Sequence, residues 1–408
     1  MIPNVVTFIL AGGKGERLYP LTKDRAKPAV PFGGIYRIID ITLSNCVNSG
    51  LRKIHTLIQY KSISLQRHIR LGWNLFNSEL GEYIDVIPAQ QRVGATWYLG
   101  TADAIYQNIY TIGQEKPELI LILAGDHIYK MNYATMMDFH RTHKADMTVG
   151  VVEFKKEFSW DLGVIETDAT RQVLGFQEKP AKPKTIPGKD DMIYASMGIY
   201  LFNRDVLEEE LINDAARKNS SHDFGKDVIP QMLKQKKRIF AYNFKDENKK
   251  EALYWRDAGT LDAYYDANMD LVEVTPIFNL YDRNWPIRTY QEQYPSAKTV
   301  FAGDENPDRM GLVLDSLISS GCIVSGGRIQ RSILSPNVRV NSYSEVHDSI
   351  LMEGVNVGRY AKIRKAIIDK DVIIPPRTVI GYDLKKDKKR FTVSDNGVVV
   401  VAKGTKIG

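Results

Sequence analysis

Short apolar segments alternate with amphipathic stretches between residues 5 and 272. Apolar runs of this length predict strands, and the unbroken run at 119–124 fits a strand buried on both faces. This alternation favours an α/β domain in which helices cover a mixed, mostly parallel sheet. The predicted strands are Val5–Leu10, Ile54–Ile58, Leu119–Ala124, Met147–Val152, Tyr194–Phe202 and Ile239–Phe244, and the predicted helices are Ser62–Arg70, Ala102–Ile112, Tyr133–His143, Phe224–Lys236 and Leu261–Val272.

The C-terminal part of the chain follows a different pattern, a repeat of 17 residues. Aliphatic residues fall five or six positions apart within each repeat, which is typical of a parallel β-helix built from hexapeptides. Each coil of such a helix buries its aliphatic row against the next coil. A β-sandwich of alternating strands is the structural alternative. The recurring positions are Val338, Val355 and Val372, Val340, Val357 and Ile374, and the pairs at 333–334, 350–351 and 367–368.

The segment between these two patterns has no clear period and is rich in Tyr, Trp and Pro. An unstructured loop of about thirty-five residues would be unusual, so the aromatic residues predict a segment packed between two domains. The expected organisation is an α/β domain over 1–272, a packed linker over 273–310 and a β-helix domain over 311–408.

Composition narrows the class of protein. With 408 residues the chain is too long for one ordinary core. Its net charge of +6 suits small anionic substrates and falls short of a nucleic-acid-binding composition. Cys46 and Cys322 have no metal-binding spacing, which favours the cytoplasm. Because the net charge is modest, nucleic acid is not an expected partner. The sequence predicts neither a signal peptide nor a membrane span, so a membrane is not an expected partner either.

The loop Ala-Gly-Gly-Lys-Gly-Glu-Arg follows the first predicted strand and ends at Arg17. Glycine lets the backbone approach a phosphate closely, and a helix beginning here would favour negative charge. Arg17 can grip phosphate oxygens with two hydrogen bonds, and Lys27 can add a point charge. The loop therefore predicts a polyphosphate site. Its spacing fits neither the dinucleotide-binding nor the Walker A pattern, and tight turns also use glycine for structural reasons.

Two acidic residues are candidates for holding a metal ion. Asp126 follows the strand at 119–124, and ligands bind at the carboxyl ends of such strands. Asp257 precedes a Gly-Thr helix start. Mg²⁺ prefers carboxylate oxygens, but capping of the next helix or turn is the alternative for both residues. Lys179 precedes a proline, which predicts an extended backbone and an aimed side chain, with an ordinary surface lysine as the alternative.

A series of motifs runs in order along the chain: LAGGKGERL, AKPAVPFGG, YRIIDITLSN, WYLGTADA, LAGDHIYKM, EKPAKP, ASMGIYLF, SSHDFGKD, YWRDAGT and YDRNWPIRTY. Together they resemble the sugar-nucleotide pyrophosphorylases, most closely the ADP-glucose branch of that family. The resemblance implies a Rossmann-like nucleotidyltransferase domain followed by a left-handed β-helix. It also implies Mg²⁺-dependent formation of ADP-glucose and pyrophosphate from ATP and glucose 1-phosphate, for glycogen synthesis.

The resemblance also implies roles for individual residues. Arg17, Lys27 and Asp126 would be catalytic, and Asp126 and Asp257 would hold the metal. The implied substrate-binding residues are Gly12, Gly13 and Gly15 for the triphosphate, Gln90 and Gln91 for the adenine, Glu178 and Lys179 for glucose 1-phosphate, and Tyr98, Gly163 and Ser196 for the sugar pocket, with Gly100 as a further substrate-binding residue.

The family's enzymes are commonly tetramers regulated by metabolites. We therefore expect a homotetramer, or a heterotetramer with a regulatory paralogue, and a metabolite effector. Relatives often carry basic residues near Asp24 and at Ile35, so the effector stays open. The competing hypotheses are a non-catalytic regulatory subunit, which would usually lose Arg17 or Asp126, and a hexapeptide acyltransferase, for which His347 is the one histidine in the repeats. Another base or sugar phosphate is the alternative within the enzyme class.

Overall fold

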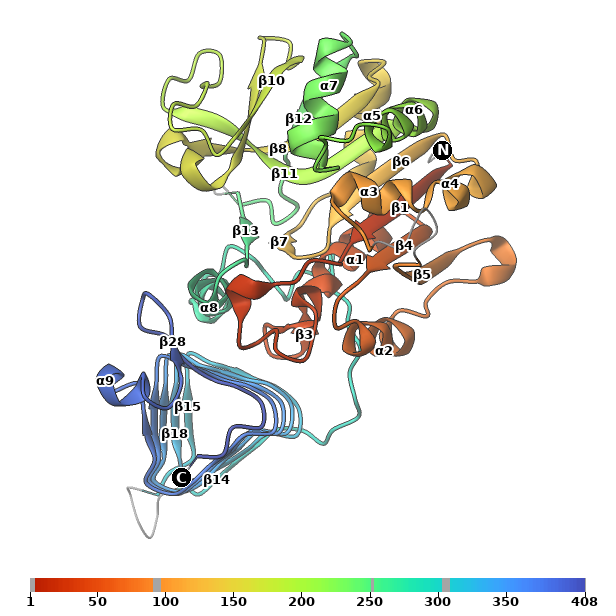
Figure 1. The fold of residues 1–408 in the computed structure, drawn as a ribbon. Helices are drawn as coiled ribbons and strands as arrows, with labels where there is room; N and C mark the ends of the chain where they lie inside the picture. The colour runs from red at the N-terminus through yellow and green to blue at the C-terminus, as the bar shows by residue number, and fades with distance from the viewer. Residues whose placement is uncertain (1–3, 91–96, 251–252, 303–308, 408) are drawn as a thin grey trace.

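The structure, a computed structural model, describes residues 4–90, 97–250, 253–302 and 309–407. Figure 1 shows an α/β domain and, below it, a three-sided coil of short strands. The large sheet has the order β10-β9-β11-β6-β1-β4-β5, with β8 paired to β11 and β12 to β8. Its strands are β1 Val5–Leu10, β4 Lys53–Ile58, β5 Tyr83–Pro88, β6 Leu119–Ala124, β8 Met147–Lys155, β9 Gly163–Thr167, β10 Val173–Glu178, β11 Met192–Asn203 and β12 Ile239–Asn243.

The sheet is mixed, as the sequence predicts. Strands β6, β1, β4 and β5 are parallel, and so are β12 and β8. Strand β11 runs antiparallel to β6, β8 and β9, and β10 runs antiparallel to β9. The helices of this domain are α1 Ile38–Asn48, α2 Ile63–Gly72, α3 Thr101–Tyr106, α4 Ile109–Glu115, α5 Tyr133–Thr142, α6 Arg204–Ala215, α7 Ile229–Lys234 and α8 Leu261–Met269.

Both faces of the central strands are buried. In β6 the residues Leu119, Leu121 and Leu123 contribute to one core, and Ile120 and Ile122 contribute to the core on the other face. Successive side chains of a strand point to opposite faces, so an unbroken apolar run is the pattern that a strand with two covered faces requires.

Three sequence predictions of helices need correction. The glycine loop leads into a single 3₁₀ turn, Glu16–Leu18, and not into an α-helix. The helix expected at 102–112 is broken into α3 and α4, because buried Asn108 bonds its side-chain amide to the carbonyl of Ala104 and competes with the helix backbone. The helix expected at 224–236 begins as a π-turn, Phe224–Val228, before α7.

Helix α1 is absent from the sequence prediction. Its residues 38–46 are all buried, including the polar ones. A helix that is enclosed on every side has no polar face, so it lacks the amphipathic period by which surface helices are recognised.

The C-terminal region is a parallel β-helix, and the β-sandwich alternative is wrong. Three parallel ladders, β14-β17-β20-β23-β26, β15-β18-β21-β24-β27 and β16-β19-β22-β25-β29, form its three sides (Figure 1). Their bounds are β14 Lys298–Val300, β15 Leu312–Leu314, β16 Leu317–Ile318, β17 Ile323–Ser325, β18 Arg328–Gln330, β19 Ile333–Leu334, β20 Arg339–Val340, β21 Glu345–His347, β22 Ile350–Leu351, β23 Asn356–Val357, β24 Lys362–Arg364, β25 Ala366–Ile368, β26 Ile373–Ile374, β27 Val379–Ile380 and β29 Val399–Val401, with β28 Thr392–Val393 and α9 Leu384–Asp387 at the end.

The repeat of the sequence is the register of these ladders. Ile333 pairs with Ile350 and Ile350 with Ile367, while Val340, Val357 and Ile374 stack on the neighbouring side. Strand β14 pairs with β17, so a β-helix strand lies within the stretch that the sequence assigned to a linker, 273–310.

The linker and α8 join the two domains. Trp285 donates its indole N–H to Asn45 of α1 (2.8 Å), and Thr289 donates its hydroxyl to Asp40 (2.6 Å), so the linker is tied to the α/β domain. One apolar cluster contains both Leu18 and Tyr264 and residues of the β-helix such as Ile367. In the part of the chain that the structure describes, no helix combines the length and the apolar character needed to span a bilayer.

We expect Ile374→Ala to destabilise the β-helix by about 2–5 kcal/mol, because it removes a buried side chain from a stacked aliphatic row. Ile374 is 1% exposed. Its neighbour Ile373 is 68% exposed, so Ile373→Ala is the matched control and should change stability by less than about 0.5 kcal/mol. Chemical denaturation of both variants measures the difference, and equal effects would contradict the register.

Candidate active site

The glycine loop and Asp126 lie at the same edge of the sheet. Strands β1 and β6 are parallel neighbours, with Leu10 opposite Ala124, so their carboxyl ends coincide. The backbone N–H of Gly125 donates to the carbonyl of Leu10 (3.0 Å), which fixes the loop after β1 against the turn after β6. A cavity of about 430 Å³ opens here, lined among others by Gly13, Gly15, Arg17, Lys27 and Asp126.

The glycines of the loop serve different purposes. Gly15 has φ +66°, a left-handed conformation that favours glycine. A Cβ on Gly13 would meet no atom within 4 Å, so this residue faces open space in which a ligand could approach the backbone. A Cβ on Gly12 would lie 3.3 Å from Cβ of Gln59, so Gly12 allows close packing against the segment after β4.

Lys27 is the centre of the site. Its ammonium lies 2.8 Å from Oδ2 of Asp126 and 2.9 Å from Oδ1 of Asp257. The side chain is almost fully enclosed, and the 3₁₀ turn Lys27–Ala29, with Pro28 near its start, presents it to the cavity. A guanidinium nitrogen of Arg17 lies 3.8 Å from the other oxygen of Asp257. Two cations and two carboxylates therefore meet at one point.

Asp257 reaches this point through a second, two-stranded sheet. Strand β13, Trp255–Asp257, pairs antiparallel with β7, His127–Tyr129, and places Asp257 opposite His127. The capping alternative is wrong for Asp257, because Thr260 caps α8 by accepting from the N–H of Ala263. Asp126 lies in the turn between β6 and β7, so it caps no helix, and the turn part of its alternative stays open.

Charge pairing keeps Lys27 and Asp126 ionised. Burial opposes the charge of Lys27, but Asp126 and Asp257 outweigh this effect and raise the pKa of Lys27 above its ordinary 10.5. Burial would also raise the pKa of Asp126, but the Lys27 ammonium, with a smaller contribution from His127, lowers the pKa of Asp126 to about 2. Both carboxylate and ammonium carry their full charges at neutral pH.

The two carboxylates fit a divalent cation that also binds substrate phosphates. Within residues 4–90, 97–250, 253–302 and 309–407, no group of three or more His, Cys, Asp or Glu side chains could hold a metal ion by itself. Hard divalent cations with few protein ligands are held by one or two carboxylates, water and phosphate oxygens. Asp126 and Asp257, which converge on one ammonium, supply that donor set.

A second cavity of about 210 Å³ adjoins the first. Its lining includes Asp161, Gly163, Ser196, Trp255 and Asp257. Arg17 and Gly259 line both cavities. The strand β11 is bulged between Ser196 and Ile199, next to the edge where β9 begins at Gly163. The two cavities thus meet at the charged cluster.

Glu178 and Lys179 lie at the rim of the second cavity. Glu178 pairs with Gly163 across β10 and β9. The ammonium of Lys179 lies 3.1 Å from Oδ1 of Asp161, which lines the cavity. The extended backbone expected for Lys179 is wrong: its φ is +48°, in the left-handed region, where its N–H donates to the carbonyl of Leu162 (3.0 Å).

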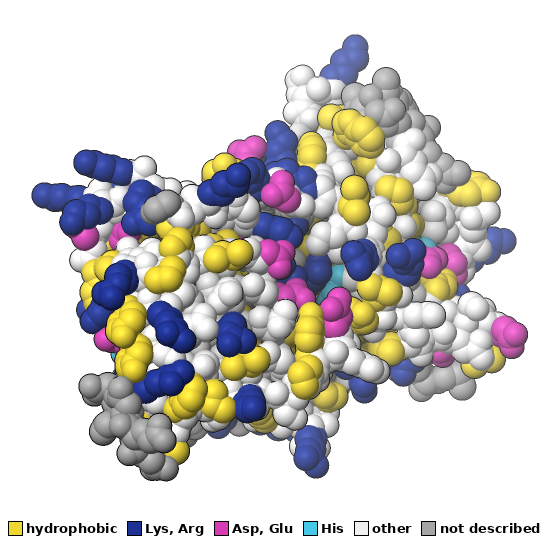
Figure 2. Space-filling model, turned by 90° about the horizontal axis from the view of Figure 1, so that it is seen from below, with side chains coloured by type: hydrophobic (Ala, Val, Ile, Leu, Met, Phe, Trp, Pro, Cys, Tyr) yellow, Lys and Arg dark blue, Asp and Glu magenta, His cyan; other side chains and the backbone are white. Residues whose placement is uncertain are grey.

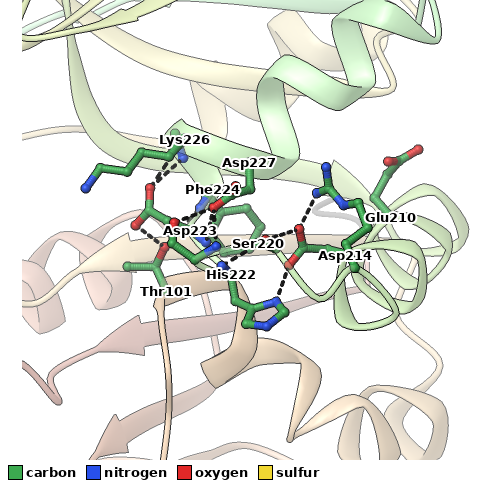
Figure 3. Close-up of polar contacts among 12 residues, drawn as sticks. Thr101, Glu210, Asp214, Ser220, His222, Asp223, Phe224, Lys226 and Asp227 are labelled. Atoms are coloured by element: carbon green, nitrogen blue, oxygen red, sulfur yellow. Dashed lines mark hydrogen bonds and ion pairs between the residues drawn. The ribbon is translucent and has the colours of Figure 1, made fainter.

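Tyr98 and Gly100 belong to a segment that the loop 220–224 holds in place. The structure brings neither residue into the lining described for the two cavities. A Cβ on Gly100 would lie 2.3 Å from the carbonyl oxygen of His222, so only glycine fits there. Figure 3 shows Thr101 beside Asp223; the Thr101 hydroxyl donates to that carboxylate (2.9 Å).

The loop 220–224 is in turn anchored to α6. Asp214, which is almost fully buried, accepts hydrogen bonds from the hydroxyl of Ser220 (2.7 Å) and from Nδ1 of His222 (2.7 Å) (Figure 3). Gln90 is exposed after β5, and its predicted partner Gln91 lies outside the described residues.

Gly259 is a site residue that the sequence analysis missed. A Cβ there would lie 2.8 Å from Oδ2 of Asp257 and 3.0 Å from Nη2 of Arg17. Asp161 and Trp255 were missed as well. Gly259 and Trp255 each lie two positions from Asp257, and Asp161 lies two positions from Gly163, so proximity in the sequence to a predicted site residue was a signal for all three.

Basic side chains are spread over the face of the molecule that is seen from below in Figure 2. Figure 2 shows Lys and Arg side chains scattered across one face, with acidic and histidine side chains among them near its centre. This distribution suits a small anionic ligand better than an extended nucleic acid.

Fold and site define a class, the nucleotidyltransferases. A family model described as nucleotidyl transferase matches residues 6–274, and one described as a GlmU-like C-terminal hexapeptide region matches residues 295–401. Relatives named glucose-1-phosphate adenylyltransferase include those of Koribacter versatilis (58% identity over 97% of this chain and 94% of the relative) and Rhodopirellula baltica (54% over 100% and 92%). The relative of Methylococcus capsulatus is 52% identical over 98% of this chain and 93% of its own.

The chain belongs to the nucleotidyl transferase family, in its glucose-1-phosphate adenylyltransferase branch. The resemblance inferred from the motifs is confirmed. The predicted fold class is confirmed as well: a nucleotidyltransferase domain is followed by a left-handed β-helix of hexapeptide repeats.

In metal-free protein, the free energy of unfolding should fall less steeply between about pH 4 and pH 2 in the variant Asp126→Asn than in the wild type. A carboxyl whose folded pKa is lowered stabilises the fold above its ordinary value of 3.8, and this contribution is lost as the pH falls toward about 2. Lys27→Met should reduce the same dependence of the unfolding free energy on pH, because it removes the ammonium that lowers the pKa of Asp126. Urea denaturation across this range measures the slope; a variant slope equal to the wild-type slope would contradict the pairing.

Proposed function

We propose that this chain is a catalytic glucose-1-phosphate adenylyltransferase, which converts ATP and α-D-glucose 1-phosphate to ADP-glucose and pyrophosphate. The observation that carries the proposal is the position of Lys27. Its ammonium lies between two carboxylates where a cavity behind a glycine loop meets a second cavity. A phosphoryl-transfer enzyme needs this combination of cations and metal-binding acids between two anionic reactants.

The larger cavity suits the ATP triphosphate. Gly13 and Gly15 leave backbone of the loop open to the cavity, and Arg17 and Lys27 supply positive charge on its wall. Gly12, which the resemblance also assigns to the triphosphate, lets the loop pack closely against the segment after β4. Gln90 and Gln91 are the expected contacts of the adenine, because an amide side chain can pair with both its amino group and a ring nitrogen.

The smaller cavity suits glucose 1-phosphate. Gly163 and Ser196 line it, and Glu178 and Lys179 lie at its rim. An ammonium there can exchange its contact with Asp161 for the sugar phosphate, and a carboxylate can accept sugar hydroxyls. Tyr98 and Gly100, on the neighbouring segment, are expected to close the pocket around the sugar.

The reaction requires no general base. A phosphate oxygen of glucose 1-phosphate is already ionised at neutral pH and attacks the α-phosphorus of ATP; the bond to the β-phosphate oxygen breaks and pyrophosphate leaves on the opposite side. The barrier lies in bringing two anions together and in the charge that develops on the leaving group. Arg17 and Lys27 lower this barrier by electrostatic stabilisation at fixed positions.

Mg²⁺ is the cation that the donor set suits best. Asp126 and Asp257 would hold it together with substrate phosphate oxygens, and when bound it would neutralise the phosphate charge. Before it binds, the ammonium of Lys27 occupies the space between these carboxylates and prevents their mutual repulsion.

The wider setting follows from the family resemblance. We expect synthesis of ADP-glucose for glycogen, a homotetramer or a heterotetramer with a regulatory paralogue, and control by a metabolite effector. Both cysteines, Cys46 and Cys322, are free and buried. Free thiols are ordinary in a reducing compartment, which supports a cytoplasmic location.

The test is pyrophosphate release from each of ATP, GTP, CTP and UTP with glucose 1-phosphate and Mg²⁺. We expect turnover with ATP and at least about tenfold lower kcat/KM with each other nucleotide, because hydrogen bonds to a base edge reject the wrong base. Equal use of all four would refute the adenine assignment. No turnover with any of them, with or without candidate metabolites, would favour a non-catalytic regulatory subunit.

We expect Asp126→Asn to lower kcat by about 10²–10³-fold, since it removes one charged group from the reacting centre. The matched control is Asp138→Asn on the exposed side of α5, which should retain wild-type rates. Circular dichroism verifies that both variants fold. Wild-type activity in Asp126→Asn would remove the metal role from this residue.

A further inference from the structure

An ion pair between the two domains lies two residues from Lys27. One guanidinium nitrogen of Arg25 donates to both carboxylate oxygens of Asp369, at 2.7 and 2.9 Å. The side chains of Arg25 and Asp369 are only 8% and 2% exposed. The two residues are 344 positions apart in the sequence. Charge-assisted hydrogen bonds are shorter and stronger than neutral ones, so this contact holds the two side chains firmly together.

The aspartate end of the pair is fixed within the β-helix. Asp369 follows β25 directly, and its backbone N–H donates to the carbonyl of Val401 (2.9 Å). Its Oδ1 also accepts from the backbone N–H of Lys370 (2.7 Å). The carboxylate is therefore held in position by the stacked coils.

The arginine end belongs to the segment that builds the larger cavity. The hydroxyl of Thr22 donates to the carbonyl of Gly15 (2.8 Å), which connects the segment to the glycine loop. Cβ of Lys27 would lie only 3.1 Å from a Cβ on Gly15, so these two residues pack closely. Arg25 lies between Thr22 and Lys27 in the sequence. A displacement of its backbone would therefore also shift the backbone of these two residues.

Cohesion between the domains does not depend on this ion pair. A large apolar cluster already joins residues 18–41 and α8 to the β-helix. Moreover, a buried ion pair can often be replaced by apolar side chains without loss of stability, because the cost of desolvating two charges offsets their attraction. The pair therefore contributes something that apolar contacts do not provide, namely a defined position for the segment.

We propose that Arg25 and Asp369 are positioning residues, through which the β-helix sets the place of Lys27 and of the glycine loop in the ATP site. Arg25 and Asp369 are not among the residues that line the two cavities, so within the described chain they act through Lys27. The inference rests on the proposed function, because it takes the larger cavity to be the site of the ATP triphosphate.

The test is a double-mutant cycle on ATP affinity, measured by equilibrium dialysis with radiolabelled ATP and full-length protein. The variant Arg25→Met/Asp369→Met keeps the net charge and leaves no unpaired buried ion. We expect it to weaken ATP binding on the order of tenfold, because a small displacement of a binding group is costly. In a Lys27→Gln background the same pair of substitutions should add less than about twofold.

The matched control is Tyr265→Phe. The Tyr265 hydroxyl donates to the carbonyl of Asp348 (2.6 Å), which is a contact between α8 and the β-helix outside the segment 22–27. This variant should bind ATP as the wild type does. Equal weakening by Tyr265→Phe, unchanged affinity of the double variant, or the same factor in both backgrounds would overturn the inference.

The outcomes also separate this inference from the proposed function. Wild-type protein that does not bind ATP would refute the proposed function. Wild-type protein that binds ATP, with a folded double variant of equal affinity, would refute only the role of the ion pair. Thermal denaturation establishes that the double variant is folded. Asp369→Asn, which keeps the side-chain shape, is the second variant, and it should weaken ATP binding more in the wild-type background than in the Lys27→Gln background.

Discussion

The charged cluster around Lys27 is the interaction on which the site depends. Two carboxylates from different sheets approach within 3 Å of one enclosed ammonium, and neither could lie so near the other without it. The same balance keeps Asp126 ionised far into the acid range and keeps Lys27 charged. The cluster therefore keeps two carboxylates and one ammonium side by side at fixed positions, and the functions proposed for them would need little rearrangement when an anion binds.

Two glycines beside this cluster leave space for it and for a ligand. Gly13 faces open space, and a side chain on Gly259 would collide with both Asp257 and Arg17. The two cavities meet at these residues, so two ligands bound in them would be close neighbours. An attack on phosphorus in line with the leaving group requires such an arrangement, with the cations along the wall and the acids at the junction.

The β-helix supports the α/β domain from below (Figure 1). Its aliphatic rows stack in register and give a stiff column, while α8 and the segment after the glycine loop pack against its side. The buried contact between Arg25 and Asp369 lies within this interface. The β-helix is thus in direct contact with the segment that carries Lys27.

The sequence by itself determined the elements with a strong period or an unbroken apolar run: β1 and β6 to the residue, the 17-residue register of the β-helix, and the glycine loop with Asp126 at a strand end. These features are local, since backbone geometry and side-chain alternation are written in neighbouring residues. Only the tertiary structure decided that Asp257 and Asp126 meet at Lys27, that Gly259 packs closely against Arg17, that residues 38–46 of α1 are buried on every side and that Arg25 meets Asp369. Each of these depends on a pairing between distant segments, which no local pattern records.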